Sequence, residues 1–217
     1  GAMLGDSSMV RSAYGRWSFQ FGHANDQREW LNLKLGSLKG IPLNPVAEYK
    51  RKGNAQNFFQ CRTIPLPSVD DIGKAFYRGK KKKNFIDRYL FQESFYKSRE
   101  LLLATWYMDD GCKVSYSNGG PARAARIATH CFRVEDVIWL AIFLTKNGYD
   151  SYAYPMSINK KRYWELRFTE DGAIALWNTI GRYVPQSMRH KLGEKAPLFD
   201  EDAWDIGTAI AHKAPAR

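Results

Sequence analysis

The sequence predicts an α+β protein made of two similar units, each with the order helix, two strands, helix, two strands, helix. Three observations support this prediction. An apolar helix ends abruptly at Asp109-Asp110-Gly111, a shorter version of that ending stands at Leu4-Gly5-Asp6, and a similar series of strands and helices follows each. Because the two endings lie about half the chain apart, duplication of one unit explains the pattern.

The acidic endings are unusual in themselves. The helix dipole disfavours negative charge at a helix C-terminus, so an apolar helix gains nothing from ending in carboxylates. Two such endings in one basic protein indicate carboxylates that are placed for a metal ion. Gly111 permits the backbone turn that ends the helix.

The first unit continues with a strand-like alternation at 17–21 and then an Asp26-x-x-Glu29 capping box, which predicts a helix that ends near Gly36. Residues 49–63 are typical of a hairpin with a basic turn. A helix is expected at 69–78, and four lysines follow it at 80–83.

The second unit repeats this series. We expect a strand at 126–132, a helix from about 134 to 147, a hairpin at 154–169 with a basic turn, and a helix at 170–183, followed by Lys191. Trp30, Trp139 and Trp177 fall on the predicted helices and are expected in the core. Two such units related by an approximate twofold axis would bring their acidic helix ends together.

Composition narrows the class of partner. The chain has 217 residues, a net charge of +11 and a pI near 9.6, with an ordinary hydrophobic content of 44%. A folded protein this basic most often binds a polyanion, so nucleic acid is the first candidate and an acidic membrane surface the second. The longest apolar run, 137–144, is too short to span a bilayer, and we see no signal peptide.

The cysteines indicate the compartment. Cys61, Cys112 and Cys131 are odd in number and widely spaced, so they form neither a disulfide framework nor a CxxC zinc pattern. We therefore expect an intracellular, reducing location. The four histidines show no metal-binding spacing.

The motifs at 106–111 and 4–7, with a C-terminal segment at 184–192, resemble the LAGLIDADG homing endonucleases, specifically the single-chain, two-motif type encoded in mobile introns. The resemblance covers residues 1 to about 195, although the first motif helix is represented by only a few residues. It implies two αββαββα units at 1–97 and 98–195, each a saddle-shaped antiparallel sheet backed by helices. The tail at 196–217 has no assigned role.

By this resemblance, Asp6 and Asp110 are the metal ligands and catalytic carboxylates. Hard carboxylate oxygens suit Mg²⁺, and Mn²⁺ is expected to substitute for it. Neighbours on a helix point apart, so we expect Asp109 to be structural or solvent-facing. Lys191 and one of Lys82 or Lys83 would polarise water or offset phosphate charge.

The sheets would carry DNA recognition, because side chains alternate across a strand and leave one face for base edges. The candidates for that face are Ser18, Gln20, Gln60, Arg62, Arg126, His130, Glu165 and Arg167. Six basic residues at the two hairpin turns are expected to contact phosphates: Lys50, Arg51, Lys52, Lys160, Lys161 and Arg162.

The leading hypothesis is a monomeric, Mg²⁺-dependent, site-specific endonuclease. It would hydrolyse one phosphodiester on each strand of a long, asymmetric double-stranded DNA target, across the minor groove, and leave short 3′ overhangs. The alternative is an intron RNA maturase on the same scaffold, with weak or no cleavage. A DNA-binding regulator without chemistry leaves both acidic motif ends unexplained. The host compartment stays open among organelle, bacterium and phage-infected cell.

Overall fold

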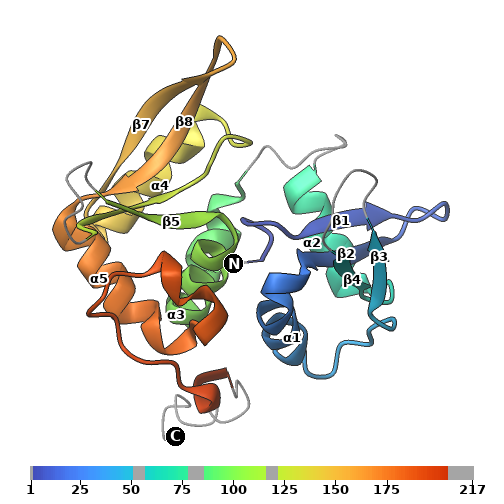
Figure 1. Ribbon diagram of the computed structural model, residues 1–217. Helices are drawn as coiled ribbons and strands as arrows, with labels where there is room; N and C mark the ends of the chain where they lie inside the picture. Colours follow the sequence, from blue (N-terminus) through green and yellow to red (C-terminus); the bar gives the residue numbers. More distant parts are fainter. Residues whose placement is uncertain (1, 51–56, 78–85, 116–121, 205–217) are drawn as a thin grey trace, which may run out of the picture.

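The computed structural model describes residues 2–50, 57–77, 86–115 and 122–204. Figure 1 shows two α/β units side by side, with the described N-terminal residues between them, next to α3. The first unit contains β1 (Ser8–Arg11), β2 (Trp17–Ala24), η1 (Asn25–Gln27), α1 (Arg28–Gly36), β3 (Ala47–Lys50), β4 (Asn57–Arg62) and α2 (Pro67–Tyr77). The second contains α3 (Arg88–Asp110), β5 (Gly111–Val114), β6 (Ala124–Ile127), α4 (Val134–Lys146), β7 (Ser151–Ile158), β8 (Lys161–Phe168) and α5 (Glu170–Ile180).

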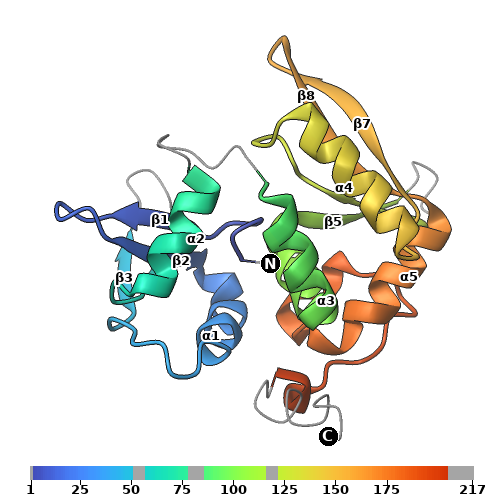
Figure 2. The same ribbon diagram turned by 180° about the vertical axis from the view of Figure 1, so that it is seen from behind.

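The duplication is visible in the topology. Each unit has a four-stranded sheet with antiparallel pairs, in the order β1-β2-β4-β3 in the first and β5-β6-β8-β7 in the second. Helices α1 and α2 pack on β2, and α4 and α5 pack on the second sheet, as Figure 2 shows from behind. The predicted fold class of two antiparallel sheets backed by helices is therefore confirmed.

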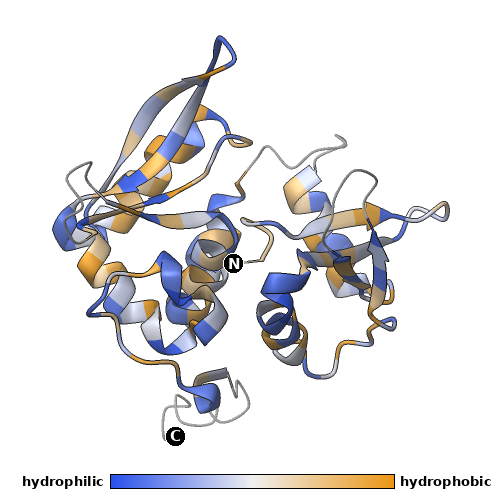
Figure 3. Cartoon of the chain, in the orientation of Figure 1, coloured by the Kyte–Doolittle hydropathy of each residue, from blue (hydrophilic) through white to orange (hydrophobic). Residues whose placement is uncertain are grey.

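The core forms between each sheet and its helices. Phe19 and Phe21 on β2 alternate with polar residues and point inward, as do Leu166 and Phe168 on β8. Figure 3 shows the corresponding hydrophobic segments along α4, whereas the tip of the β7–β8 hairpin is hydrophilic. Trp30 and Trp177 are buried as expected, and Trp139 is half-buried.

Three expectations about the elements are wrong in detail. The strand predicted at 126–132 ends at Ile127, because the chain turns there toward α4. The capping box does not form: α1 begins at Arg28 after a 3-10 turn, and its N-cap Gln27 makes no side-chain capping bond. The helix predicted at 170–183 ends at Ile180 and continues as a 3-10 turn at Gly181–Tyr183.

The second motif helix is broken near its middle. Ser98 in α3 has φ −159° and ψ 56°, which are not helical values. Upstream of this break, Phe91 and Phe95 pack edge-on against Phe143 of α4. The boundary predicted at 97/98 falls at the break, but the residues just before it pack against the second unit. In the first unit, residues 2–6 form turns and no helix.

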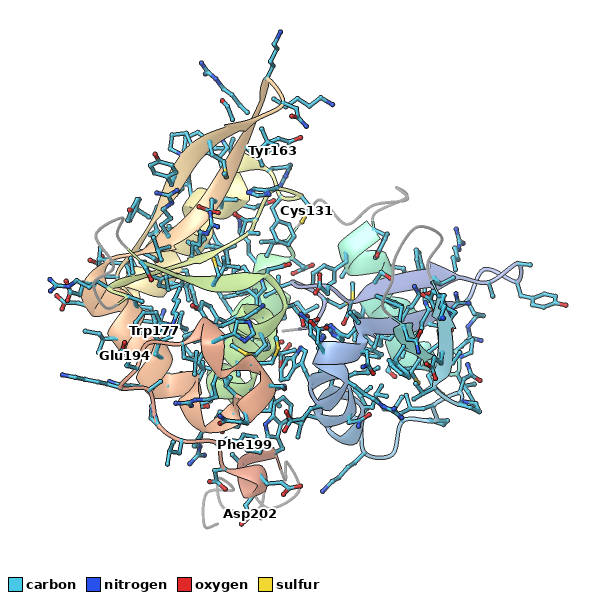
Figure 4. All side chains as sticks on the ribbon, viewed as in Figure 1. Cys131, Tyr163, Trp177, Glu194, Phe199 and Asp202 are labelled. Atoms are coloured by element: carbon cyan, nitrogen blue, oxygen red, sulfur yellow. The ribbon has the colours of Figure 1, made fainter. Side chains whose placement is uncertain are left out.

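The tail folds back onto the first unit. After η3 (Gln186–Lys191), the chain reaches a short 3-10 helix, η4 (Glu201–Trp204). Trp204 is buried, donates its indole N–H to the Tyr183 carbonyl at 3.0 Å, and meets Trp30 of α1 edge-on at 5.5 Å between ring centroids. Figure 4 labels Phe199 and Asp202 on this segment. Among the helices that the structure describes, none has both the length and the hydrophobicity of a transmembrane span.

Candidate metal and nucleic-acid site

The two predicted metal ligands occupy equivalent places in the two units. One residue, Ser7, separates Asp6 from β1, and Asp110 is the last residue of α3, directly before β5. Asp6 is exposed to solvent, and Asp110 is half-buried. The Asp110 carbonyl accepts a hydrogen bond from the Ala128 amide at 2.9 Å, which fixes the end of α3 against the strand β6.

The two segments meet at the interface between the units. The Asp6 amide donates to Asp109 Oδ2 at 3.1 Å, so the backbone of one predicted ligand contacts the neighbour of the other. A Cβ on Gly5 would lie only 2.3 Å from Asp109 Cβ. Glycine is therefore needed at this close approach, since any larger side chain would push the two segments apart.

Lys191 lies at the same helix end. Its ammonium donates to the Met108 carbonyl at 2.5 Å and to the Asp109 carbonyl at 3.3 Å. Burial lowers the pKa of Lys191, while the negative charges of Asp109, Asp6 and Asp110 raise it. The structure thus brings the predicted lysine and both predicted metal ligands into one electrostatic site.

Tyr107 holds the segment that carries Lys191. Its buried hydroxyl donates to the Lys191 carbonyl at 2.9 Å and accepts the indole N–H of Trp177 at 3.1 Å. Burial raises the pKa of Tyr107, so the hydroxyl stays protonated and remains a donor. Trp177 belongs to α5 and is labelled in Figure 4.

Asp109 was expected to be either structural or solvent-facing, and the structure shows the structural role. Its side chain is fully buried and receives Lys34 Nζ at 2.6 Å and the Trp30 indole N–H at 2.9 Å. Lys34 also contacts His23 Nε2 at 2.9 Å. The roles of Lys34 and His23 were not predicted from the sequence; a lysine at a buried position of an amphipathic helix was the available signal.

Asp6, His23 and Asp109 also form a trio whose ligand atoms lie within 4.8 Å of one another. This trio does not suit a divalent cation, because the Lys34 ammonium already contacts both Asp109 and His23. Burial and the Lys34 charge lower the pKa of His23 to about 4, so the ring is neutral and accepts from Lys34. The carboxylates that suit a hard cation are those of Asp6 and Asp110.

The polar residues predicted on the first sheet share its outer face. Gln20 pairs with Arg62 across β2 and β4, and the Arg62 guanidinium donates to Gln20 Oε1 at 2.9 Å. Ser18 lies two positions from Gln20 on β2, and Gln60 lies two positions from Arg62 on β4, so their side chains lie on the same face of the sheet. Lys50 is exposed at the end of β3. Arg51, Lys52, Lys82 and Lys83 lie outside the described residues.

The outer face of the second sheet carries a charge network. Glu165 is only 2% exposed and accepts from Arg126 at 3.2 Å and from Arg167 at 3.0 Å. The Arg167 guanidinium also lies 3.5 Å from the centroid of the Tyr154 ring. The two arginines are thus held in fixed orientations on the face that the sequence assigned to DNA.

His130 differs from its expected place. It lies in the turn after β6, where Nε2 contacts Met156 Sδ at 3.0 Å and the ring lies 5.5 Å from Tyr163. Figure 4 shows Tyr163 on the β7–β8 hairpin. Lys160, Lys161 and Arg162 are exposed at the tip of that hairpin, with Asn159 and Lys160 at positive φ.

Comparisons with known proteins agree with this architecture. The intron-encoded endonuclease ai4 of Dictyostelium discoideum is 27% identical over 77% of this chain and 98% of its own length. The cytochrome b mRNA maturase bI2 of Saccharomyces cerevisiae is 25% identical over 89% of this chain and 46% of its own. A RecA protein of Mycobacterium shimoidei is 31% identical over 58% of this chain, which spans only about a quarter (27%) of that relative.

A solved structure and a family model complete the comparison. The homing endonuclease I-WcaI bound to its DNA recognition sequence superposes with a TM-score of 0.67 at 20% identity, over 91% of this chain and 83% of that one. The family model for the LAGLIDADG DNA endonuclease family matches residues 1–171. With both acidic motif ends at the interface of two duplicated units, the chain belongs to the LAGLIDADG DNA endonuclease family.

Proposed function

We propose that this protein is a site-specific endonuclease that cuts both strands of a long double-stranded DNA target with a divalent metal ion, and leaves short 3′ overhangs. The observation that carries the proposal is the meeting of the two motif ends. The Asp6 amide contacts Asp109, the neighbour of Asp110, and the half-buried Lys191 donates to the Asp109 carbonyl at 3.3 Å, where the charges of Asp6 and Asp110 both raise its pKa. Two carboxylates and one lysine at a twofold interface match the approximate twofold symmetry of duplex DNA.

The donor set fits Mg²⁺. Asp6 and Asp110 offer hard carboxylate oxygens at the ends of two backbone segments that the sheets hold in place. A divalent ion held there supplies charge neutralisation and an activated water for phosphodiester hydrolysis. The buried trio around Asp109 is excluded as the metal site by the Lys34 ammonium inside it.

The other residues have separate tasks in this proposal. Lys191 places a positive charge beside the carboxylates, where it offsets charge on the scissile phosphate. Arg126 and Arg167 reach base edges in the major groove, and guanine is the base that an arginine fork matches best. Lys160, Lys161 and Arg162 contact phosphates at the hairpin tip and set the orientation of the duplex.

A second function is favoured by one comparison. The similarity to a yeast mRNA maturase extends over 89% of this chain, more than the similarity to the intron-encoded endonuclease. A maturase on this scaffold would bind structured intron RNA through the same excess of positive charge. Retention of both Asp6 and Asp110 favours cleavage as the main activity.

The test is a cleavage selection on a randomised double-stranded DNA library with Mg²⁺, with the variant Asp6→Asn/Asp110→Asn as control. We expect the wild-type protein alone to yield one long cut site with two distinguishable halves. Failure of the wild-type protein to cut, together with tight binding of a structured intron RNA, would favour the maturase. Equal cutting by the control variant would contradict the assignment of the metal ligands.

A further inference from the structure

The contacts of Asp109 cross the boundary between the two units. Asp109 belongs to α3 of the second unit, whereas Lys34 and Trp30 belong to α1 of the first. Lys34 Nζ contacts both carboxylate oxygens, at 2.6 and 2.9 Å, and the Trp30 indole N–H donates at 2.9 Å. We call Asp109, Lys34 and Trp30 the interunit clamp.

The interunit clamp also reaches one of the predicted metal ligands. Asp109 Oδ2 accepts the backbone N–H of Asp6 at 3.1 Å. Asp109 is covalently adjacent to Asp110, so a single carboxylate connects the backbones of the two predicted ligands. A displacement of Asp109 therefore changes the separation between Asp6 and Asp110.

The clamp is a one-sided feature of a duplicated protein. Counted from the Trp-Leu pair that α1 and α4 share, Phe143 stands in α4 where Lys34 stands in α1. Gly5 stands before Asp6 where Asp109 stands before Asp110. Gly5 leaves the room that the Asp109 side chain occupies, since a Cβ there would lie 2.3 Å from Asp109 Cβ.

Two further contacts support the clamp from outside. Trp204 of the tail packs edge-on against Trp30 at 5.5 Å between ring centroids, and both rings are buried. On the same α1, Glu29 accepts from the Ser187 hydroxyl at 2.5 Å, which ties η3 and its Lys191 to the first unit. The tail segment 201–204 therefore covers the back of the clamp.

We infer that Asp109 is a positioning residue, which together with Lys34 and Trp30 sets the separation of Asp6 and Asp110. A fixed separation keeps the cutting of the two DNA strands concerted. This inference rests on the proposed function. Asp110 is held independently by α3 and by the bond from the Ala128 amide. Asp6 is held by the hydrogen bond from its own amide to Asp109. Loss of the clamp therefore displaces Asp6 more than Asp110. The strand whose cleavage depends on Asp6 is then cut more slowly, and nicked DNA accumulates.

The test uses the full chain and the DNA site that the wild-type protein selects, carried on a supercoiled plasmid. Asp109→Asn leaves the Lys34 ammonium buried without its partner, so the main variant is Asp109→Asn/Lys34→Gln, which removes both charges. We expect DNA affinity without added metal to stay within about twofold of wild type. The cleavage rate at saturating DNA falls about 10- to 100-fold, as for other supporting partners of metal ligands, and the ratio of nicked to linear product rises.

The matched control is Asp136→Asn. Asp136 is another fully buried aspartate with two arginine partners, Arg133 and Arg88, but it lies in α4 outside the site. We expect this variant to lose stability and to keep the wild-type cleavage rate and product ratio. If the main variant cleaves both strands at the wild-type rate, the clamp only stabilises the fold and the inference is wrong. If the wild-type protein cuts no DNA, the proposed function itself fails, which is a separate result.

Discussion

At the scale of single residues, charge burial separates the roles of neighbouring aspartates. Asp109 and Asp110 are adjacent in the sequence, yet the first is fully buried against Lys34 and the second is half-buried. A carboxylate neutralised by an ammonium at 2.6 Å has little affinity left for a metal ion. The proposed metal site therefore uses the carboxylates of Asp6 and Asp110, and not the carboxylate of Asp109 that pairs with Lys34.

His23 gives a prediction about stability and pH. Its pKa is lowered to about 4, from 6.5, because burial and the Lys34 charge both disfavour the imidazolium. As the pH falls from about 6.5 to about 4, His23 is therefore protonated in the unfolded chain but stays neutral in the folded protein. We expect this to cost on the order of 3 kcal/mol of unfolding free energy over that range.

The measurement compares the wild-type protein with His23→Gln by chemical denaturation between pH 4 and pH 7. As the pH falls, the unfolding free energy of the wild-type protein should decrease more than that of the variant. Parallel curves would show that His23 is accessible to protons in the folded state.

Glu165 gives a prediction about specificity. It holds Arg126 and Arg167 on the outer face of the second sheet. In Glu165→Gln the neutral amide pairs less strongly with both guanidiniums, so their orientation relaxes. We expect discrimination at one or two base pairs of one half-site to fall by about 1–3 kcal/mol, measured by competition among single-base variants of the selected DNA. Unchanged discrimination would exclude these arginines from base readout.

At the scale of elements, α1 and its counterpart α4 show what the sequence reveals and what it hides. The repeated order of elements and the acidic motif ends were predictable, because apolar periodicity and motif spacing are local signals. The role of α1 was not predictable. Lys34, Glu29 and Trp30 contact three different segments, α3, η3 and the tail, over separations of at least 75 residues. Local patterns carry no information about such pairings.

The β6 strand illustrates the same limit. Its alternation suggested a strand through residue 132, but the described strand ends at Ile127. The requirement that the chain turn into α4 overrides the local preference. His130 consequently lies in a turn and not on the strand, and contacts Met156 and Tyr163 of the β7–β8 hairpin from there.

The tip of the β7–β8 hairpin supports a prediction at this scale. Lys160, Lys161 and Arg162 are exposed there, beyond the rest of the sheet. Replacing all three by Gln would remove the phosphate contacts that we propose for them and leaves Asp6, Asp110 and Lys191 unchanged. We expect weaker binding of all DNA sequences alike and a salt dependence reduced by about two to three units of slope. A loss confined to the selected sequence would instead assign base readout to this tip.

At the scale of the whole molecule, the net charge of +11 and the duplicated architecture act together. Two sheets present polar outer faces, and the acidic motif ends meet between the units. In the proposed function, the positive charge attracts the duplex, and the interface between the units supplies the carboxylates. In the proposed function, the sheets and hairpins bind the DNA, and the residues at the interface carry out the chemistry.

The central claim is tested most directly with Asp110→Asn on the selected DNA, in parallel measurements of binding without metal and of cleavage with Mg²⁺. The substitution keeps the size of the side chain at the end of α3 and removes its charge. We expect the affinity for DNA to remain within a few-fold of wild type and cleavage to fall by more than about 100-fold, beyond the loss that a supporting partner causes. Cleavage at the wild-type rate would contradict the account, because the carboxylate of Asp110 would then hold no metal ion.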